Sequence, residues 1–70
     1  MKYFRHKNAL VGKNAKIGKG TRIWAFSNIQ DGAVIGKNCN IGDGCFVEEG
    51  VTIGNHVTLK NGVAVFKGVT

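Results

Sequence analysis

The stretch that decides the fold is IGKNCNIGDGCFVEEGVTIG, residues Ile35 to Gly54. Ile41 follows Ile35 by six residues, and the same step leads on to Val47 and Ile53. Extended in both directions, the step gives ten aliphatic residues without an insertion: Val11, Ile17, Ile23, Ile29, Ile35, Ile41, Val47, Ile53, Leu59 and Val65. A six-residue step turns a helical residue through about 600°, off any single face, so this period excludes a helix.

Two further positions of the repeat indicate a short strand followed by a corner. The residue two before each aliphatic is small or β-branched in all ten units, as at Cys39 and Cys45. Because alternate residues of a strand point to the same side, both positions face one interior. The residue three after each aliphatic is Gly or Asn in eight units, and His56 is of a type that also tolerates positive φ. We therefore predict left-handed turns at the corners, His56 included.

Glycines mark the length of one coil. Gly18, Gly36 and Gly54 recur at every third unit, so one coil corresponds to three units of six, eighteen in all. We predict an all-β fold, a parallel β-helix of triangular coils, with stacked strands about 4.8 Å apart. Residues 11–70 supply a little over three coils, open at the C-terminal end. Residues 1–10 are expected to form an N-terminal cap in which Tyr3 and Phe4 cover the open core.

The two cysteines are predicted to be buried small residues with free thiols. The alternatives are half a metal site, a redox pair, a calcium loop and a phosphate loop. Cys39 and Cys45 are expected on different walls, which disfavours a disulfide, and the pattern supplies no further inward ligands for a metal. A calcium loop needs several carboxylates, whereas Asp43 stands alone locally. A phosphate loop would lead into a helix, and no helical period follows. We expect no metal site.

Composition narrows the class of partner. The chain has 70 residues, a formal net charge of +6 and 43% hydrophobic residues, too many for a disordered tail. We find no apolar run of signal-peptide or membrane-spanning length. A basic excess spread along the chain is typical of a solvated surface, so we expect neither nucleic acid nor membrane as a partner; phosphate-bearing small molecules are the alternative. Two cysteines without secretory context predict a cytoplasmic protein.

The repeat resembles that of the hexapeptide-repeat acyltransferases, whose coil is a left-handed β-helix. A closer resemblance lies in YFRHKNALV, IGKGTRIWAFSNI, GAVIGKNCNIGDGCFV and VTIGNHVTLKNGVAVFKGVT. These segments look like the opening coils of bacterial enzymes that acetylate the 3-amino group of a nucleotide-linked sugar. The resemblance implies a left-handed coil, acetyl-CoA as co-substrate, a nucleotide-linked amino sugar as substrate and a homotrimer with its active site between subunits. The products of that family enter surface polysaccharides.

Several motif positions of that family differ in this chain. Ala25 stands where the family has His, and Asp43 and Asn61 align with the first residues of its Gln-Asn and Asn-Asn pairs. The family's Phe-Thr-Asn segment and most of its CoA-binding stretch would follow Thr70. We see no strong general base in the chain. We therefore expect the chain alone to be inactive, and a non-catalytic structural or oligomerisation β-helix is the alternative function.

Asp43 and Asn61 are candidate substrate-binding residues. Asp43 follows Ala25 by three units of the repeat and Asn61 follows Asp43 by three more, so we predict that they stack along one edge of the prism. We hypothesise that this edge begins the substrate cleft. Ordinary turn residues are the alternative.

Three side chains beside that edge suit a nucleotide. The Arg22 guanidinium matches the geometry of a diphosphate, and the Trp24 ring can stack on a base. Lys60 lies in the column of Trp24 and is a further candidate for phosphate binding. Surface residues that shield the wall are the alternative.

One outer wall carries the most apolar side chains. Leu10, Phe46 and Phe66 are predicted to lie on it, and clustered exposed aromatics suggest a contact surface. We expect this wall to form the interface of the homotrimer. The alternative is that the Phe rings lie flat on their own wall.

Overall fold

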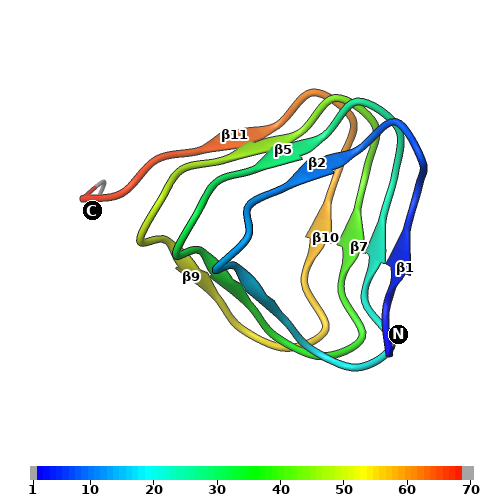
Figure 1. Cartoon of the computed structure of the whole chain (residues 1–70), viewed down its shortest axis with the longest axis horizontal. Helices are drawn as coiled ribbons and strands as arrows, with labels where there is room; N and C mark the ends of the chain where they lie inside the picture. Colours follow the sequence, from blue (N-terminus) through cyan, green and yellow to red (C-terminus); the bar gives the residue numbers. More distant parts are fainter. Residues whose placement is uncertain (1, 69–70) are drawn as a thin grey trace.

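The chain folds as a triangular coil of short parallel strands (Figure 1). A computed structural model describes residues 2–68; residue 1 and residues 69–70, at the outer ends of the predicted cap and coils, lie outside that range. Eleven strands of two residues each follow one another at six-residue intervals: β1 (Phe4–Arg5), β2 (Leu10–Val11), β3 (Lys16–Ile17), β4 (Arg22–Ile23), β5 (Asn28–Ile29), β6 (Val34–Ile35), β7 (Asn40–Ile41), β8 (Phe46–Val47), β9 (Thr52–Ile53), β10 (Thr58–Leu59) and β11 (Ala64–Val65).

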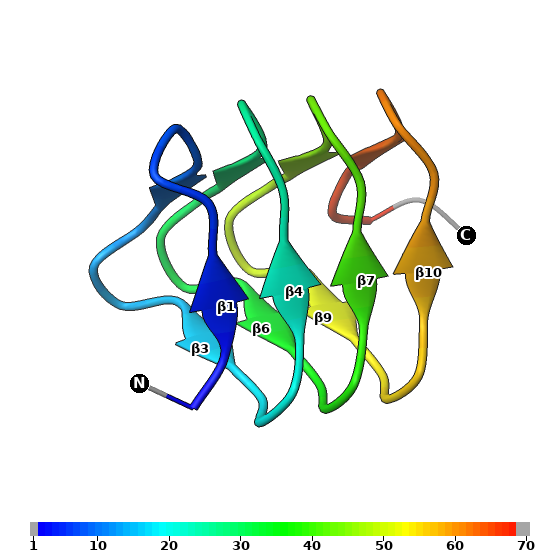
Figure 2. The same ribbon diagram turned by 90° about the vertical axis from the view of Figure 1, so that its right-hand side faces the viewer.

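Every third strand joins the same sheet, so the prism has three walls (Figure 2). Sheet A has the order β1-β4-β7-β10, sheet B the order β2-β5-β8-β11 and sheet C the order β3-β6-β9. All neighbours are parallel and pair residues three units apart, as Arg22 with Asn40 and Ile23 with Ile41. The prediction of a parallel β-helix with three hexapeptide units per coil and a little over three coils is confirmed. The left-handed sense of the coil stays a prediction of the resemblance.

The second residue of each strand points into the prism and fills it. In the middle coils these inward aliphatics are at most 1% exposed. Each such side chain contributes about 1.5–3 kcal/mol when removed from water, so their columns supply much of the stability of the fold. The fully buried members are Ile23, Ile29, Ile35, Ile41 and Val47.

The inward small residues tie each coil to the next through hydrogen bonds. The Thr21 hydroxyl donates to the carbonyl oxygen of Gly36 (2.6 Å) and accepts from the backbone N–H of Cys39 (3.0 Å). One unit further along the chain, the Ser27 hydroxyl donates to the carbonyl oxygen of Gly42 (2.6 Å) and accepts from the backbone N–H of Cys45 (3.1 Å). These hydroxyls are fully buried and fully paired, which is what burial of a polar group requires.

The thiols continue this ladder one coil later. The Sγ of Cys39 lies 3.1 Å from the carbonyl oxygen of Gly54, and that of Cys45 lies 3.1 Å from the carbonyl oxygen of Lys60. Both cysteines are buried and free. The prediction that they are buried small residues, not a disulfide, is confirmed. They act in addition as weak donors to the corner of the next coil.

Corner residues adopt the predicted left-handed conformation with one exception. Nine of the ten predicted positions have positive φ, among them His56 at 60°, whose expected turn role is confirmed. Phe26 also has a φ of 62°, although its residue type disfavours this region. The prediction is wrong for Asn14, which does not adopt a positive φ. Its N–H instead bonds to Asp31 Oδ1 of the next coil at 2.7 Å, which closes this corner differently.

The N-terminal residues behave only partly as the predicted cap. Tyr3 packs against the buried core, as a capping residue should. Phe4, however, is the outward residue of β1, pairs with Arg22 and is 44% exposed, so the expectation that it covers the open core is wrong. The reason is register: β1 lies one full coil before β4 and continues sheet A. Residues 4–5 therefore belong to the coil itself.

Candidate functional site

The edge between sheets A and B, here called the site edge, carries the predicted polar column. The N–H of Gly44 bonds to the carbonyl oxygen of Ala25 (2.9 Å), and that of Gly62 bonds to the carbonyl oxygen of Asp43 (2.8 Å). Successive corners are thus stacked in register, and the predicted alignment of Ala25, Asp43 and Asn61 is confirmed. Their role in substrate binding stays a prediction.

The side chains of Asn61 and Asp43 differ in how many of their polar atoms remain available to a ligand. The Asn61 Oδ1 accepts the backbone N–H of Asp43 at 2.9 Å, so half of this side chain stabilises the turn. Asp43 is exposed and contributes its backbone to the same ladder. Of the two, Asp43 has the side chain more available to a ligand.

Arg22 and Trp24 meet on the outer face of sheet A through Asn40. The indole N–H of Trp24 donates to Asn40 Oδ1 at 2.9 Å, and the Nε of Arg22 donates to the same oxygen at 3.2 Å. Phe4 packs on the indole, with ring centroids 5.0 Å apart and an interplanar angle of 50°. The arrangement fixes a half-buried indole beside a guanidinium.

This cluster has chemistry that suits an anion with a planar group. Because Nε is bound to Asn40, the two terminal amino groups of Arg22 are the donors left for an anion, in the fork geometry of a guanidinium. The Trp24 ring offers an aromatic surface, and its contact with Phe4 restricts its rotation. The sequence reasoning missed Asn40, although its position one coil after Arg22 predicted the pairing.

Lys60 lies in the column of Trp24, two coils further along. Gly42 separates them and is buried. Two steps of strand spacing place the backbones of Lys60 and Trp24 about 10 Å apart. Lys60 is exposed, and its carbonyl oxygen accepts the N–H of Val63 (3.2 Å) and faces the thiol of Cys45. The structure thus brings Arg22 and Trp24 together and leaves Lys60 separate.

Sheet B presents the apolar wall that the sequence predicted. Leu10 is 67% exposed and Phe66 is 51% exposed. Phe46 is half-buried, and its ring centroid lies 5.6 Å from that of Phe66 at 44° between the planes. The two rings therefore pack on each other, while Asn28 separates Leu10 from Phe46 in the outward column of this sheet.

Phe26 lies at the site edge, in the corner that leads from β4 into β5, and sequence reasoning did not single it out. It is 72% exposed, the most of any large hydrophobic residue described. The next two residues of its column are Gly44 and Gly62, where a side chain would meet nothing within 4 Å. The exposed ring of Phe26 is thus followed in its column by two glycines with open space around them. Its only signal in the sequence is that an aromatic residue occupies a turn position that otherwise holds mostly Gly or Asn.

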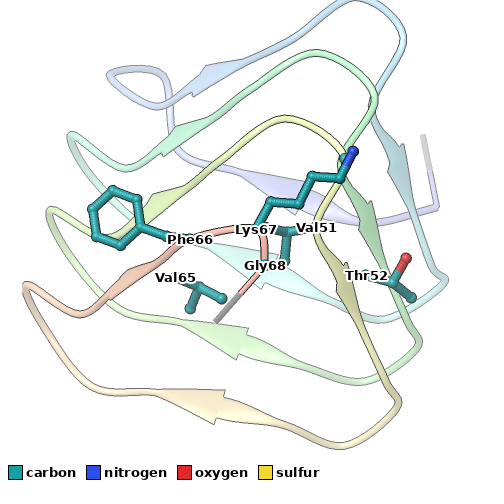
Figure 3. Close-up of a pocket in the computed structure, with 7 residues that line it drawn as sticks. Val51, Thr52, Val65, Phe66, Lys67 and Gly68 are labelled. Atoms are coloured by element: carbon teal, nitrogen blue, oxygen red, sulfur yellow. The ribbon is translucent and has the colours of Figure 1, made fainter. Parts of the chain in front are cut away.

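A cavity of about 350 Å³ lies at the C-terminal end of the coil, away from the site edge (Figure 3). Phe66, Lys67 and Gly68 form one side, and Val51 and Thr52 of the preceding coil form the other. None of the predicted substrate-binding residues lines it. The cavity lies beside β9 of sheet C, and we assign it no ligand.

Within residues 2–68, no three His, Cys, Asp or Glu side chains group as metal ligands would. His6 uses its Nδ1 to accept the N–H of Asn8 at 3.0 Å, and His56 is an exposed corner residue. In the same range no helix has the length and hydrophobicity to cross a bilayer.

The hexapeptide repeat matches a known protein family. A family model described as bacterial transferase hexapeptide (six repeats) matches residues 14–49 and again residues 32–67. The two matches overlap and together include every strand from β3 to β11. A comparison with curated proteins finds no match.

Proposed function

Because the chain belongs to the bacterial transferase hexapeptide family, we propose that its acyltransferase-type β-helix serves the acetyl-CoA-dependent N-acetylation of a nucleotide-linked amino sugar. The observation that carries the proposal is the Arg22–Trp24–Asn40 cluster beside the site edge. It combines a fixed aromatic ring with a guanidinium, the two groups that a base and a diphosphate require. A 3-amino sugar and a place in surface polysaccharide synthesis belong to the proposal through the sequence resemblance.

Each candidate residue has a distinct part in this proposal. Trp24 stacks on the base, and the free amino groups of Arg22 bind the diphosphate. Asp43 contacts the sugar from the corner above Ala25, and Asn61 holds that corner in place through its bond to the Asp43 N–H. Lys60 lies too far along the edge to share a phosphate with Arg22 at close range and adds a longer-range attraction.

The reaction itself is a transfer between two bound substrates. The sugar amine attacks the thioester carbonyl of acetyl-CoA, a C–N bond forms, the C–S bond breaks, and the proton lost by the amine neutralises the departing thiolate. Holding both substrates in line accounts for a large part of such an acceleration. We infer no general base among these residues, and we expect the chain alone to bind without turnover.

The oligomer in this proposal is a homotrimer formed through sheet B. Its support is the exposure of Leu10 and Phe66 on the outer side of this sheet, together with the Phe46–Phe66 pair. Exposed apolar surface of this kind is typical of protein contacts. A cytoplasmic location is proposed as well, because both thiols are free.

Intrinsic fluorescence tests substrate binding directly, because Trp24 is the only tryptophan. We expect a saturable change when a nucleotide-linked amino sugar is titrated into the folded chain. Arg22→Gln should weaken binding about 10-fold, the usual cost of a lost charge-assisted contact. Lys13→Gln removes an exposed charge from another edge and should bind like the unmodified chain. No change from a chain that circular dichroism shows to be folded would contradict the proposal.

A structural or oligomerisation β-helix is the second candidate function. The exposed apolar wall on sheet B and the turn bond of Asn61 favour it. Sedimentation of a Phe46→Lys, Phe66→Lys variant tests the wall: we expect monomers. Val34→Lys, which adds a charge to an exposed apolar position of sheet C, is the matched control and should leave the trimer intact. An unchanged trimer in the double variant would exclude sheet B as the interface.

A further inference from the structure

The three edges of the prism differ in charge, although the basic residues look scattered in the sequence. The edge between sheets C and A, here called the basic edge, is the row of turns at the bottom of Figure 2. It collects four of the ten Lys and Arg residues. The four acidic residues lie on the other two edges: Asp43 on the site edge, and Asp31, Glu48 and Glu49 between sheets B and C. The basic residues are Lys2, Lys19 and Lys37 on the corner itself, flanked by Lys16 on β3.

The corner hydrogen bonds reinforce this segregation. On the edge between sheets B and C, carboxylates accept the corner N–H groups: Asp31 from Asn14 (2.7 Å) and Glu48 from Lys67 (2.9 Å). On the basic edge, the N–H of Lys37 donates instead to the neutral side-chain amide oxygen of Asn55 (2.8 Å). The coil is therefore held together here without a negative charge next to the lysines.

Lys19 and Lys37 stack in one exposed column of the basic edge, and Lys2 lies at the N-terminal end of the neighbouring column. The N–H of Asn38 bonds to the carbonyl oxygen of Lys19 (3.0 Å), and the N–H of His56 bonds to that of Lys37 (2.9 Å), so successive corners stack in register. Strand spacing sets Lys19 and Lys37 about 4.8 Å apart at the backbone. All the basic side chains of this edge are exposed. Like charges held this close repel one another, and a polyanion relieves the repulsion.

We propose that the basic edge is a docking surface for a linear acidic polysaccharide. An extended chain with anionic groups on its sugars can run along this corner, past Lys2, Lys19 and Lys37 in turn. The positive charges of the corner itself are all lysines (Lys2, Lys19 and Lys37), and lysine recognises charge without demanding the planar geometry that arginine reads. The corner also lacks what nucleic acid binding uses. Its exposed side chains are Lys, Asn and His, without the aromatic stacking platforms of single-strand binders, and among the described residues it has no helix to enter a groove.

The chain offers a matched pair of variants for the test. Lys19→Gln with Lys37→Gln removes two charges from the basic edge. Lys13→Gln with Lys67→Gln removes two charges from the equivalent corner positions between sheets B and C, where Asp31 and Glu49 occupy the same column. Both double variants have the same net charge, and glutamine keeps much of the apolar stem. Binding is measured with a fluorescent heparin oligosaccharide at several salt concentrations, after circular dichroism has shown that each variant is folded.

We expect the Lys19, Lys37 variant to bind the oligosaccharide about 10-fold more weakly at low salt, and the Lys13, Lys67 variant to bind like the unmodified chain. Added salt should reduce the difference, since exposed charges are screened. Equal losses in both variants would overturn the proposal, because net charge alone would then explain binding. Equal affinity for single-stranded DNA of the same charge would overturn the choice of polysaccharide. The Trp24 titration of the proposed transferase site is independent of either result.

Discussion

The middle coils and the last coil carry the same kinds of residue in the same columns, yet they are buried to very different degrees. Ile23, Ile41 and Leu59 share one column of sheet A. The first two are fully buried, whereas Leu59 is only half-buried. The other inward residues of the last coil, Val57, Val63 and Val65, are likewise only half-buried. Burial in this fold therefore depends on having a coil on both sides, more than on pointing inward.

The largest expected consequence concerns the aliphatic column. Ile41→Ala should lower the free energy of unfolding by about 3–4 kcal/mol, because the cavity has walls on every side. Leu59→Ala should cost about 1–2 kcal/mol, because solvent already reaches that side chain. Equilibrium urea unfolding followed by far-UV circular dichroism measures both.

A chain of this size has little stability to lose, so Ile41→Ala can unfold it outright. Ile41→Val then provides a graded measurement, with an expected cost of about 1 kcal/mol. If Leu59→Ala costs as much as Ile41→Ala, the last coil is covered in solution and the contrast between the coils is wrong.

Two glycines of one column on the basic edge give the next largest expected difference between a middle coil, at Gly36, and the last coil, at Gly54. A Cβ on Gly36 would lie 2.7 Å from the carbonyl carbon of Gly54 and against the side chain of Asn55, whereas a Cβ on Gly54 would meet nothing within 4 Å. Gly36→Ala should therefore destabilise by about 2 kcal/mol, since a packed backbone must move. Gly54→Ala should be neutral or slightly stabilising. Thermal unfolding compares them, and a Gly36→Ala chain as stable as the unmodified one would show that the coils are not stacked this tightly.

The buried hydroxyl of Thr21 supplies a smaller effect. Thr21→Val keeps the shape of the side chain but leaves the N–H of Cys39 and the carbonyl oxygen of Gly36 without their partner. Leaving buried groups unpaired costs about 1–3 kcal/mol, and we expect about 1.5 kcal/mol here. Val57→Thr, two coils later in the same column, should change stability less, because Val57 is only half-buried and solvent can reach the new hydroxyl. Urea titration of both variants measures this, and equal losses would contradict the role of the hydroxyl.

The fold was predictable because one period specifies every contact between coils. Once residues are known to stack at every third unit, the pairing of Ile23 with Ile41 and of Arg22 with Asn40 follows from arithmetic. The conformation of Phe26 was not accessible from propensity, since a bulky residue disfavours positive φ. The register of the coil imposes it, because a turn must occur at that point. Tertiary context here overrides a local preference.

The candidate site was predictable only in part. Register placed Ala25, Asp43 and Asn61 in one column, and the corner bonds follow that column. The bond from Trp24 to Asn40 lies off the register and depends on the direction in which the indole lies across sheet A. The packing of Phe4 on Trp24 was missed for a similar reason, because residues 4–5 looked like a cap and not like a strand. The six-residue period predicts which residues stack, but it does not predict the direction in which an outward side chain lies across a sheet.

Phe26 also offers the smallest predicted effect and a comparison within one column. It and Gly44 occupy equivalent corners, with φ of 62° and 67°, but only Gly44 adopts this conformation without steric cost. Phe26→Asn keeps a side chain at the corner and substitutes a type that tolerates the left-handed region. Because the left-handed region costs an ordinary residue about 1–2 kcal/mol, relief of part of that cost should raise stability by about 0.5 kcal/mol. Thermal unfolding at a protein concentration too low for association measures the change. A loss of stability would mean that the exposed ring of Phe26 makes a contact worth more than its backbone strain, and would identify Phe26 as a residue that packs against the coil or a second copy of the chain.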